Sequence, residues 1–368
     1  MRAKVSKKDI LPAVVRGAGI VDRKSVMPIL SHILLDFNKD GLTVRATDLD
    51  HSIIEKIPAR IDTFGTIAVP AGVFCDILRK ADDSADLEFS LIDKGEKLQL
   101  TAGRSKYELS TLNAQDFPVI PTVDNSCRFT FKCELFNKLI SRTKFSMSPE
   151  ENRHTLNGIY LHREDDMLRA ASTDGHRLSV SAIPIDAKES IQGVIVSRKT
   201  IVEIKKLLDV VEGDITITFS QNLIQFELGN VVFISKLVDG NFPDYKRVIP
   251  PTDGSDFFTV KRSDFVSVVD RVSVISEDKS RAIKLELNKN TLCCYVVNNK
   301  LGSGKDEVDV SYSGEGWVAG FNSGYLLDVA QTLEGDQLKV FVKESLTPVL
   351  IIDESEPESL FVIMPMRI

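Results

Sequence analysis

A repeat of about 125 residues is the feature that most constrains how this 368-residue chain can fold. Three segments each begin polar and then place apolar residues three and four positions apart, as an amphipathic helix does. They are "SKKDILPAVVRGAG" from Ser6, "KCELFNKLISRTKFS" from Lys132 and "KRSDFVSVVDRVSVIS" from Lys261. A second helical segment follows each of them: "GVFCDILRKA", "RKTIVEIKKLLD" and "NSGYLLDVAQTLE". A fixed period of this kind predicts several similar domains along the chain.

The rest of each copy is typical of antiparallel sheet. Each second helix follows a short apolar strand ("TIAV", "GVIV", "GWVAGF") and precedes an acidic turn with a β run ("DLEFSLI", "GDITITFS", "GDQLKVFV"). The alternating segments "EKLQLTAGRSKYELSTL" and "NLIQFELGNVVFISKLV" predict hairpins. We therefore expect an α+β fold of three repeated domains, each with two helices on antiparallel sheets.

Short matches set the period and the boundaries of the repeat. Thr47-Asp48 recurs as Thr173-Asp174, and Phe117-Pro118 recurs as Phe242-Pro243, at offsets of 126 and 125 residues. The Pro- and Asp-containing stretches "VIPTVDNS" and "VIPPTDGS" are typical of linkers. We predict domains at residues 1–125, 126–249 and 250–368.

Composition excludes several classes of protein. The apolar fraction of 43% and the charged fraction of 27% are ordinary for a soluble globular protein. The five cysteines include no C-x-x-C pair, which disfavours a disulfide framework and a structural zinc site. The N-terminal "MRAKVSKKDI" lacks the apolar core of a signal peptide, and no apolar run approaches the ~18 residues of a membrane helix. We expect a cytoplasmic protein without a membrane segment.

Positive and negative charges are distributed unevenly between the predicted helices and the rest of the chain. The six predicted helices with their adjoining loop residues carry a net charge of +11, whereas the whole chain carries −7 and the remainder therefore −18. Basic helices on an acidic background are typical of a face that binds a polyanion, while the surrounding surface repels it. The alternative is that these lysines and arginines only solvate the exposed helix faces.

The stretch "ASTDGHRLSV" brings together residue types that act in catalysis. Ser172, Asp174 and His176 could share one face of a strand, as a nucleophile, an orienting acid and a base would require. Gly175 between them favours a turn instead, and the chain has no G-x-S-x-G elbow. "NKLGSGKDE" is not a phosphate loop, and no acidic pair has a histidine at metal-ligand spacing. We expect no catalytic activity, no metal and no cofactor.

Several longer motifs resemble one family, the bacterial replicative DNA polymerase sliding clamps (the DNA polymerase III β subunit). They are "MPILSHILL", "ATDLDHSI", "ASTDGHRLSV", "SKLVDGNFPDYKRVIP" and the C-terminal "FVIMPMRI". The similarity covers the whole chain. It implies a DNA clamp fold: a head-to-tail homodimer of three-domain subunits that forms a ring around duplex DNA. It also implies a processivity factor that tethers the polymerase catalytic subunit, the clamp loader and repair proteins through their short linear motifs.

The helix count agrees with a dimeric ring. Six helices packed side by side in a circle, at ~9 Å between axes, would leave a hole of only ~7 Å. Twelve would leave ~24 Å, which is about the width of a duplex. Two copies of the chain could therefore surround DNA, whereas one could not.

A sliding ring needs contacts with phosphates that carry no sequence information, and Lys and Arg provide them. We expect DNA contacts from basic residues of the helices and loops: Lys24, Lys138, Arg142, Lys144, Arg153, Arg198, Lys199 and Lys205. Lys7, Lys8, Arg16 and Lys206 are further candidates on the helices. Gly72, His154 and Thr155 depart from residues that some family members carry, so loop contacts with DNA are expected to differ here.

The resemblance also implies a hydrophobic cleft between the second and third domains, where linear motifs dock. Leu, Val and Met would form an adaptable apolar floor, and His, Arg and Asn would bind the peptide at its rim. The matching residues are Leu156, Thr173, Gly175, His176, Arg177, Leu178, Pro243, Arg247, Val248, Asn322, Tyr325, Val362, Ile363, Met364, Pro365, Met366 and Arg367. The alternative for "FVIMPM" is a terminal core strand.

The two ends of the repeat array are expected to form the dimer interface. "GRSKYELST" alternates like an edge strand and carries Arg104 and Lys106, whereas the segment after Lys305 carries Asp306 and Glu307. Edges of opposite charge predict a heterologous contact. Val274 and Ile275 match apolar interface positions of the family. Two other classes stay open: an enzyme that acts on DNA, which would need clustered carboxylates, and an acidic scaffold that binds only proteins.

Overall fold

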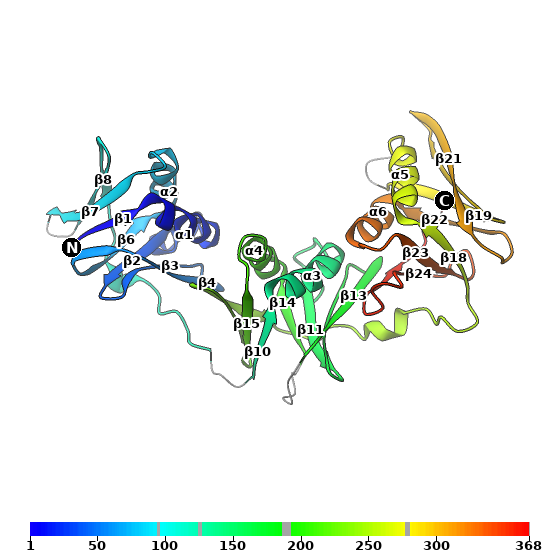
Figure 1. The fold of residues 1–368 in the computed structure, drawn as a ribbon, viewed down its shortest axis with the longest axis horizontal. Coiled ribbons are helices and arrows are strands. Elements are labelled where there is room, and N and C mark those ends of the chain that lie inside the picture. Colours follow the sequence, from blue (N-terminus) through cyan, green and yellow to red (C-terminus); the bar gives the residue numbers. More distant parts are fainter. Residues whose placement is uncertain (94–95, 124–126, 186–192, 277–279, 368) are drawn as a thin grey trace. The chain divides into compact units, whose positions relative to one another are not determined.

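The computed structural model describes residues 1–93, 96–123, 127–185, 193–276 and 280–367, and Figure 1 follows the chain through it. Close contacts divide the chain into two compact units, Met1–Cys133 with Val210–Leu237 and Glu134–Asp209 with Val238–Ile368. Each unit combines stretches that are far apart in sequence, because strands of neighbouring repeats pair with each other.

Over its described residues, the first unit contains two antiparallel sheets and two α-helices. One sheet has the order β5-β1-β7-β8-β9, and the other has the order β10-β15-β16-β17-β4-β3-β2-β6. Its elements are β1 (Arg2–Ser6), α1 (Lys7–Ile20), η1 (Pro28–Ser31), β2 (His32–Asn38), β3 (Gly41–Thr47), β4 (His51–Ile57), β5 (Arg60–Thr63), β6 (Gly65–Pro70), α2 (Ala71–Lys80), β7 (Asp86–Ile92), β8 (Lys97–Ala102), β9 (Ser105–Ser110), η3 (Ala114–Asp116), β10 (Cys127–Lys132), β15 (Asp214–Phe219), β16 (Leu223–Leu228) and β17 (Val231–Val238).

The second unit contains the remaining four helices. Its longer sheet has the order β14-β11-β12-β13-β25-β24-β23-β18, and the shorter has the order β22-β19-β20-β21. Its elements are α3 (Cys133–Thr143), η4 (Lys144–Ser146), β11 (Gly158–Glu164), β12 (Met167–Thr173), β13 (Arg177–Pro184), β14 (Val194–Ser197), α4 (Arg198–Leu208), η5 (Tyr245–Val248), β18 (Asp256–Lys261), α5 (Arg262–Ser273), β19 (Ala282–Asn288), β20 (Thr291–Asn298), β21 (Gly302–Ser311), β22 (Trp317–Asn322), α6 (Ser323–Thr332), β23 (Gln337–Val342), β24 (Val349–Ile352) and β25 (Leu360–Ile363).

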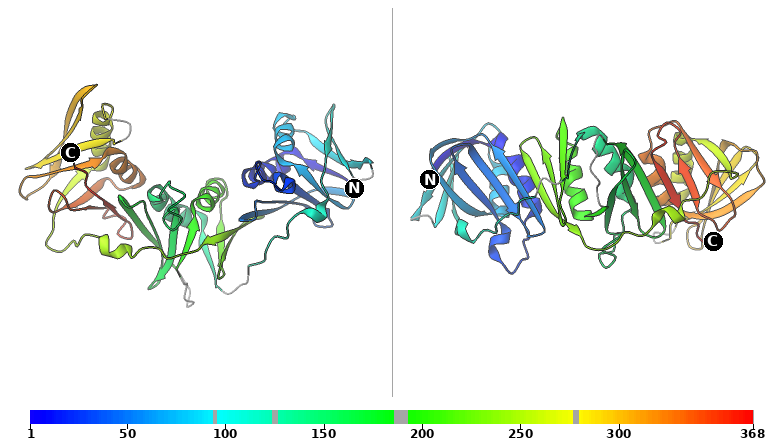
Figure 2. Two further views of the ribbon diagram at one scale, coloured as in Figure 1. Left: turned by 180° about the vertical axis from the view of Figure 1, so that it is seen from behind. Right: turned by 90° about the horizontal axis from the view of Figure 1, so that it is seen from below.

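The six helices are those that the apolar spacing predicts. In α1, Ile10, Ala13 and Val14 are buried and form its core-facing side. A side chain at Gly17 would approach Ile33 to 3.1 Å, so this glycine lets the helix lie close to the sheet. The Ser6 hydroxyl begins the helix by accepting the Lys8 amide at 3.2 Å. Helix α1 lies beside α2, and α5 lies beside α6, on one face of their sheets (Figures 1 and 2).

The three-domain α+β fold is confirmed, and strand pairing shows how neighbouring repeats connect. The hairpin β3–β4 of the first repeat corresponds to β12–β13 of the second, and to β20–β21 of the third. In the first unit, β4 pairs antiparallel with β17 of the next repeat. In the second unit, β13 pairs with β25 of the next repeat in the same way. A continuous sheet therefore joins each domain to the one that follows it.

Candidate functional site

The segment that suggests catalysis forms a tight turn between two paired strands. Strand β12 ends at Thr173 and β13 begins at Arg177. Gly175 adopts φ of +90°, a conformation that other residues rarely reach. One carboxylate oxygen of Asp174 accepts the amides of His176 and Arg177 at 2.9 and 3.0 Å. The turn predicted from Gly175 is present, and the Asp174 carboxylate stabilises it.

The serine of this segment has a structural partner as well. Ser172 is fully buried, and its hydroxyl donates a hydrogen bond to the carbonyl of Thr143. Asp174 is also buried and binds backbone amides, whereas His176 is exposed. The three side chains thus have separate surroundings, and the two that are buried serve to join chain segments.

Arg177 connects the turn to helix α6. Its guanidinium donates to Asp174 at 3.1 Å, to Asp328 at 2.5 Å and to the carbonyl of Phe145 at 2.5 Å. The same group lies 4.2 Å from the centre of the Tyr325 ring, in cation–π geometry. The side chain is only 11% exposed. Arg177, which is expected at the rim of a peptide cleft, thus lies mostly buried and joins the turn, α6 and η4.

Asn322 likewise has an internal role. Its side-chain oxygen accepts the amides of Gly324 and Tyr325 at 2.9 and 3.3 Å and so caps α6. Its amide nitrogen donates to the carbonyl of Ser280 at 3.3 Å. Arg177 and Asn322 are thus bound within the chain, whereas the His176 side chain is exposed and makes no hydrogen bond to the part of the chain described here.

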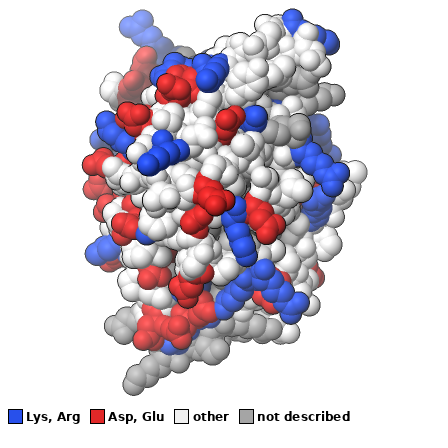
Figure 3. Space-filling model, turned by 90° about the vertical axis from the view of Figure 1, so that its right-hand side faces the viewer, with Lys and Arg blue, Asp and Glu red and all other residues white. Residues whose placement is uncertain are grey.

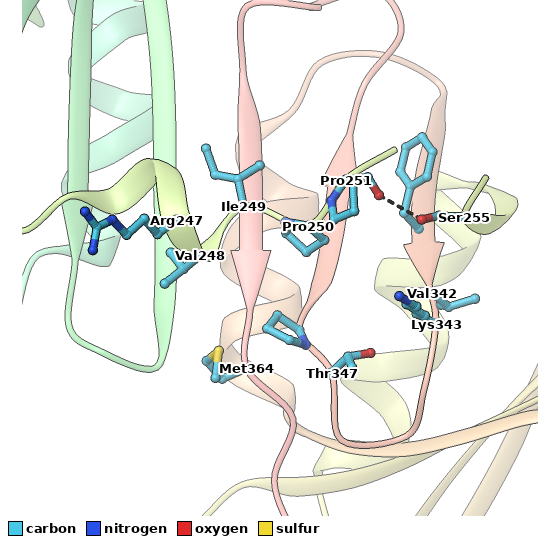
Figure 4. A pocket seen from close by; sticks show the side chains of 12 residues that line it. Arg247, Val248, Ile249, Pro250, Pro251, Ser255, Val342, Lys343, Thr347 and Met364 are labelled. Atoms are coloured by element: carbon cyan, nitrogen blue, oxygen red, sulfur yellow. Dashed lines mark hydrogen bonds between the residues drawn. The ribbon is translucent and has the colours of Figure 1, made fainter. Parts of the chain in front are cut away.

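A pocket of about 390 Å³ opens beside this turn, between the linker that follows β17 and the ends of β23 and β25 (Figure 4). Its surface is mostly apolar, and Arg247 and Lys343 place positive charge at its edge. The Ser255 hydroxyl donates to the carbonyl of Pro251 at 2.8 Å and fixes the end of the linker wall. The pocket is lined by Arg247, Val248, Ile249, Pro250, Pro251, Ser255, Phe341, Val342, Lys343, Thr347, Pro348 and Met364.

The structure divides the expected cleft residues into three groups. Arg247, Val248 and Met364 line the pocket. Leu178 and Val362 are 2% exposed and Ile363 is fully buried, so these three side chains belong to the core of this unit. The remaining expected residues lie outside the pocket lining: Leu156, Thr173, Gly175, His176, Arg177, Pro243, Asn322, Tyr325, Pro365, Met366 and Arg367.

The C-terminal tail separates this pocket from a second hollow of about 500 Å³. The Met364 amide donates to the carbonyl of His176 at 2.9 Å, and the Met366 amide donates to the carbonyl of Gly320 at 2.7 Å. Met366 and Arg367 therefore face the second hollow, whereas Met364 faces the first. The second hollow is lined by Val318, Ala319, Gly320, Ser345, Leu346, Met366 and Arg367.

Sequence reasoning missed most of the linker wall. The stretch "VIPP" suggests a domain boundary and, at Val248 alone, a cleft residue, but it contributes Val248, Ile249, Pro250 and Pro251 to the pocket. The facing residues Phe341 to Lys343 are about ninety positions away in sequence, at the end of β23. An exposed linker with two prolines and flanking apolar residues was the available indication of this wall.

Two of the basic residues expected to contact DNA are bound within the protein. Arg142 is 3% exposed and donates to both carboxylate oxygens of Glu356, at 2.8 and 2.5 Å. Lys138 lies 3.1 Å from Glu356 and 3.1 Å from Glu334. Partial burial lowers the Lys138 pKa, but its hydrogen bonds to these carboxylates outweigh this and raise it. The Arg142 guanidinium is thus bound to Glu356, and the charged Lys138 ammonium is paired with two carboxylates.

Other helix residues are paired in the same way. Lys7 is buried and lies 2.9 Å from Asp83, and it also donates to the carbonyls that end α2. Arg16 donates to both oxygens of the buried Glu55. The positive charge of the helices is thus partly cancelled by internal ion pairs, which the charge count could not reveal. Lys205 pairs with Asp209, and Lys206 pairs with Glu203.

A smaller set of basic residues remains on the surface. Lys8, Lys24 and Lys144 are exposed, and within the described ranges they form no ion pair. Lys199 is exposed, and Arg198 is half-buried with a hydrogen bond to the carbonyl of Met147 at 3.2 Å. Arg153 pairs with Glu150 and donates to the carbonyl of Asp174, which places it against the turn of the cleft.

The expected interface strands both lie at sheet edges. Among the described strands, β9, with Lys106, pairs only with β8, and Arg104 lies in the turn between them. Strand β21 pairs with β20, and with β18 only near its C-terminal end. Asp306 is held by Arg271 at 2.7 Å, and this hydrogen bond lowers the pKa of the carboxyl group. On the face of the second unit seen in Figure 3, acidic and basic side chains alternate with uncharged surface.

The two apolar interface candidates differ in their surroundings. Val274, which ends α5, is 79% exposed. Ile275 packs against the core of the third domain, and its side chain lies close to Gly304 of β21. Only Val274 therefore presents a free apolar side chain, and Leu301, 69% exposed, presents another at the start of β21.

Within the described ranges, no three His, Cys, Asp or Glu residues are grouped so that they could hold a metal ion. None of the helices in those ranges combines the length and the apolar character needed to cross a membrane.

Comparison with known proteins identifies the family. The chain matches the sequence models of the DNA polymerase III beta subunit: the N-terminal domain at residues 1–121, the central domain at 130–244 and the C-terminal domain at 246–367. The beta sliding clamps of Caulobacter vibrioides (strain NA1000 / CB15N) and Escherichia coli (strain K12) are 38% and 32% identical to it over 373 and 370 residues, with 100% of each chain covered.

Solved structures agree. A DnaN sliding clamp from Bartonella birtlesii bound to griselimycin has a TM-score of 0.95 at 38% identity. One from Pseudomonas aeruginosa bound to griselimycin has a TM-score of 0.94 at 32% identity, and both matches cover 100% of each chain. The chain therefore belongs to the DNA polymerase III beta subunit family, the beta sliding clamps of bacterial DNA replication.

Proposed function

We propose that two copies of this chain close head to tail into a ring that encircles duplex DNA and tethers a DNA polymerase to it in the cytoplasm. The observation that carries the proposal is the strand pairing between repeats. Strand β4 pairs with β17, and β13 pairs with β25. Strand β21 of the third repeat is the counterpart of β4 and β13, and β9 of the first repeat is the counterpart of β17 and β25. Both β21 and β9 have free edges among the described strands. Pairing β21 with β9 of another copy would repeat the same junction, and two such junctions close a ring.

The known register predicts the register between copies. Glu55 of β4 lies opposite Val231 of β17. Strands β4 and β21 begin at residues 51 and 302, so Asp306 takes the place of Glu55. Strands β17 and β9 begin at residues 231 and 105, so Ser105 takes the place of Val231. Asp306 would therefore lie opposite Ser105 of the second copy, with Arg104 beside it.

The charges at this junction support the register. In the first unit, Glu55 is bound by Arg16 and also accepts a hydrogen bond from Asn230 at 3.4 Å. The third repeat reproduces the first of these contacts as the pair of Arg271 with Asp306. Arg104 stands 126 residues before Asn230 and would take its place. A second cation beside an ionised Asp306 stabilises the contact and explains why opposite charges occur on the two edges.

We propose that DNA contacts come chiefly from Lys8, Lys24 and Lys144, with Lys199, Arg153 and Arg198 as further candidates. These side chains lie on helices or adjoining loops, and the first four are exposed. Ammonium groups bind phosphates without reading sequence, so the ring can slide. Lys138 and Lys205 are weaker candidates because each already pairs with a carboxylate.

We propose that the pocket beside the turn docks short linear motifs of the polymerase catalytic subunit, the clamp loader and repair proteins. Its apolar lining, with Val248 and Met364 at the opening, suits apolar anchor residues. The relatives bound to griselimycin support a ligand site on this fold. Griselimycin is therefore a suitable probe for this chain.

The ring is tested by the shape of the DNA. A closed ring stays on nicked circular DNA but slides off the ends of linear DNA, whereas a simple binder is retained equally on both. The protein is loaded on each form, and retention is measured by gel filtration. The same preparation should hydrolyse no ester, phosphodiester or nucleotide above a buffer blank, because we propose no catalytic role. Equal retention on the two forms would refute the ring.

The cleft is tested by altering its floor. Deleting Met364–Ile368 should weaken a peptide with apolar anchors ~30-fold or more, because anchors of this kind contribute ~2 kcal/mol or more each. Met364→Ser is a milder version, and Met27→Ser, at 45% exposure against 39%, is its matched control. His176→Ala should weaken the peptide less, because one rim contact contributes only ~1 kcal/mol. Full affinity after the deletion, measured by isothermal titration, would place the docking site elsewhere.

A further inference from the structure

One wall of the pocket is a stretch of linker without strand partners. Arg247 and Val248 end the short helical turn η5, and Ile249 to Pro251 continue into the third domain as irregular chain. The backbone bonds in the turn are local and long, at 3.4 Å from Arg247 to Asp244 and 3.3 Å from Ile249 to Lys246. Backbone hydrogen bonds alone therefore do not fix this wall, although the position of the wall decides the width of the pocket.

Tyr245 anchors the linker to the sheet of the second domain. It is 6% exposed and packs in one cluster with Leu178, Phe341 and Val362. Its phenol oxygen lies 2.9 Å from Nε2 of His162 on β11. Burial raises the pKa of Tyr245 to about 12 and lowers the pKa of His162, so both groups are neutral near pH 7. Nδ1 of His162 lies 3.4 Å from the carbonyl of Arg163, which can only accept, so Nδ1 carries the ring proton and Nε2 accepts a hydrogen bond from the phenol.

Aromatic stacking and charge complete this attachment. Phe242 stacks on Tyr160 with ring centres 5.0 Å apart and planes within 4°, and Tyr160 stacks on His162 at 4.9 Å. The charged groups around the imidazole are Glu164 and Arg169 of the sheet and Lys246 of the linker, which pairs with Glu164. His162 itself does not line the pocket.

The first junction of the chain lacks this device. Its linker reads "FPVIP" from Phe117, whereas the second reads "FPDYKRVIP" from Phe242, so the four residues that include Tyr245 are an insertion. Val119, the counterpart of Val248, is 94% exposed, against 49% for Val248. The positions that correspond to Tyr160 and His162, 126 residues earlier, hold Leu34 and Asp36. The hydrogen-bonded anchor and the packed wall thus occur together at the second junction.

We propose that the Tyr245–His162 pair sets the linker wall of the pocket, so that His162 is a positioning residue for motif binding although it touches no ligand. The inference rests on the proposed function, because it assigns a role to the pocket as a docking site. A pocket whose wall is already in place binds with less ordering cost than one whose wall must first be fixed.

Four variants separate this role from general stability. Tyr245→Phe removes one hydroxyl, and His162→Leu removes the acceptor. His162→Gln keeps an acceptor near the position of Nε2. Tyr312→Phe is the matched control: Tyr312 is also 6% exposed and donates to the carbonyl of Glu315 at 2.6 Å, but it lies outside the pocket. All four are measured as full-length protein, with griselimycin as the probe in isothermal titration.

We expect Tyr245→Phe and His162→Leu to weaken griselimycin roughly five-fold, the effect of one neutral hydrogen bond. His162→Gln and Tyr312→Phe should stay within about two-fold of the unaltered chain. Amide hydrogen exchange without ligand should speed up in residues 246–249 of Tyr245→Phe and stay unchanged in α5 and α6. Unaltered affinity and exchange in Tyr245→Phe and His162→Leu would overturn the inference. Failure of the unaltered chain to bind griselimycin would instead refute the docking site itself.

Discussion

Val274→Asp is the sharpest test of the ring-closing contact. The side chain is 79% exposed at the end of α5, so a carboxylate there is solvated in the single subunit and should leave its fold intact. Burying a valine contributes about 1.5 kcal/mol, and leaving a buried carboxylate unpaired costs more, so a loss of about 2 kcal/mol per contact is a conservative value. A two-subunit ring contains the contact twice and loses about 4 kcal/mol, which weakens dimerisation about a thousand-fold.

Sedimentation velocity distinguishes the outcomes directly, because one subunit has a mass of 40.9 kDa and the ring twice that. Val119→Asp, at a residue 94% exposed in the first linker, adds the same charge away from the contact and should leave the dimer unchanged. Ile275 is a poorer choice because it packs against the core of its own domain. A Val274→Asp protein that stays dimeric at the same dilution as the unaltered chain would refute the position of the interface.

Three further outcomes are expected. Arg142→Ala should lower the free energy of unfolding by about 2 kcal/mol, because Glu356 loses two charged hydrogen bonds and retains only its contact with the partly exposed Lys138 among the described residues, and a melting curve by circular dichroism measures this. Lys24→Glu with Lys144→Glu should shorten retention on circular DNA. The slope of log binding constant against log salt concentration should become shallower by about 0.9 for each phosphate contact that is lost. The pKa of His162 is lower in the folded state than in the unfolded chain, so its contribution to stability is complete above pH 6.5 and is lost as pH falls toward the folded value. The difference between the melting temperatures at pH 7.5 and pH 5.5 should therefore be larger in the unaltered chain than in His162→Gln.

Local patterns predict the elements of this fold, but not the partners of its charged groups. The spacing of Ile10, Ala13 and Val14 is enough to predict α1, because it depends on neighbours within one turn. The ion pair of Arg142 with Glu356 joins residues 214 positions apart, and no local pattern reports it. Counting charge by helix therefore identified basic elements correctly and overestimated the charge free to bind DNA.

In the candidate cleft too, the sequence predicts local features but not contacts between residues far apart in the chain. The motif around Gly175 indicates the turn because a single residue determines it. Whether Val362 faces a ligand or the core depends on the alternation of β25 against β13, and the pairing of these strands places it in the core. The contribution of the linker wall depends on Tyr245 reaching His162, eighty-three positions earlier, which only the folded chain reveals.

Free strand edges at both ends of one chain also carry a hazard. If a copy donates its β21 edge to a second copy while a third joins at β9, the contacts continue without closing, and subunits add to a growing filament. Charged side chains on an edge strand make such addition less favourable, and β9 presents Lys106 and Glu108 to solvent. A ring that closes after two subunits leaves no edge for further growth. The geometry that closes the ring would then also protect the cell from aggregation of this protein.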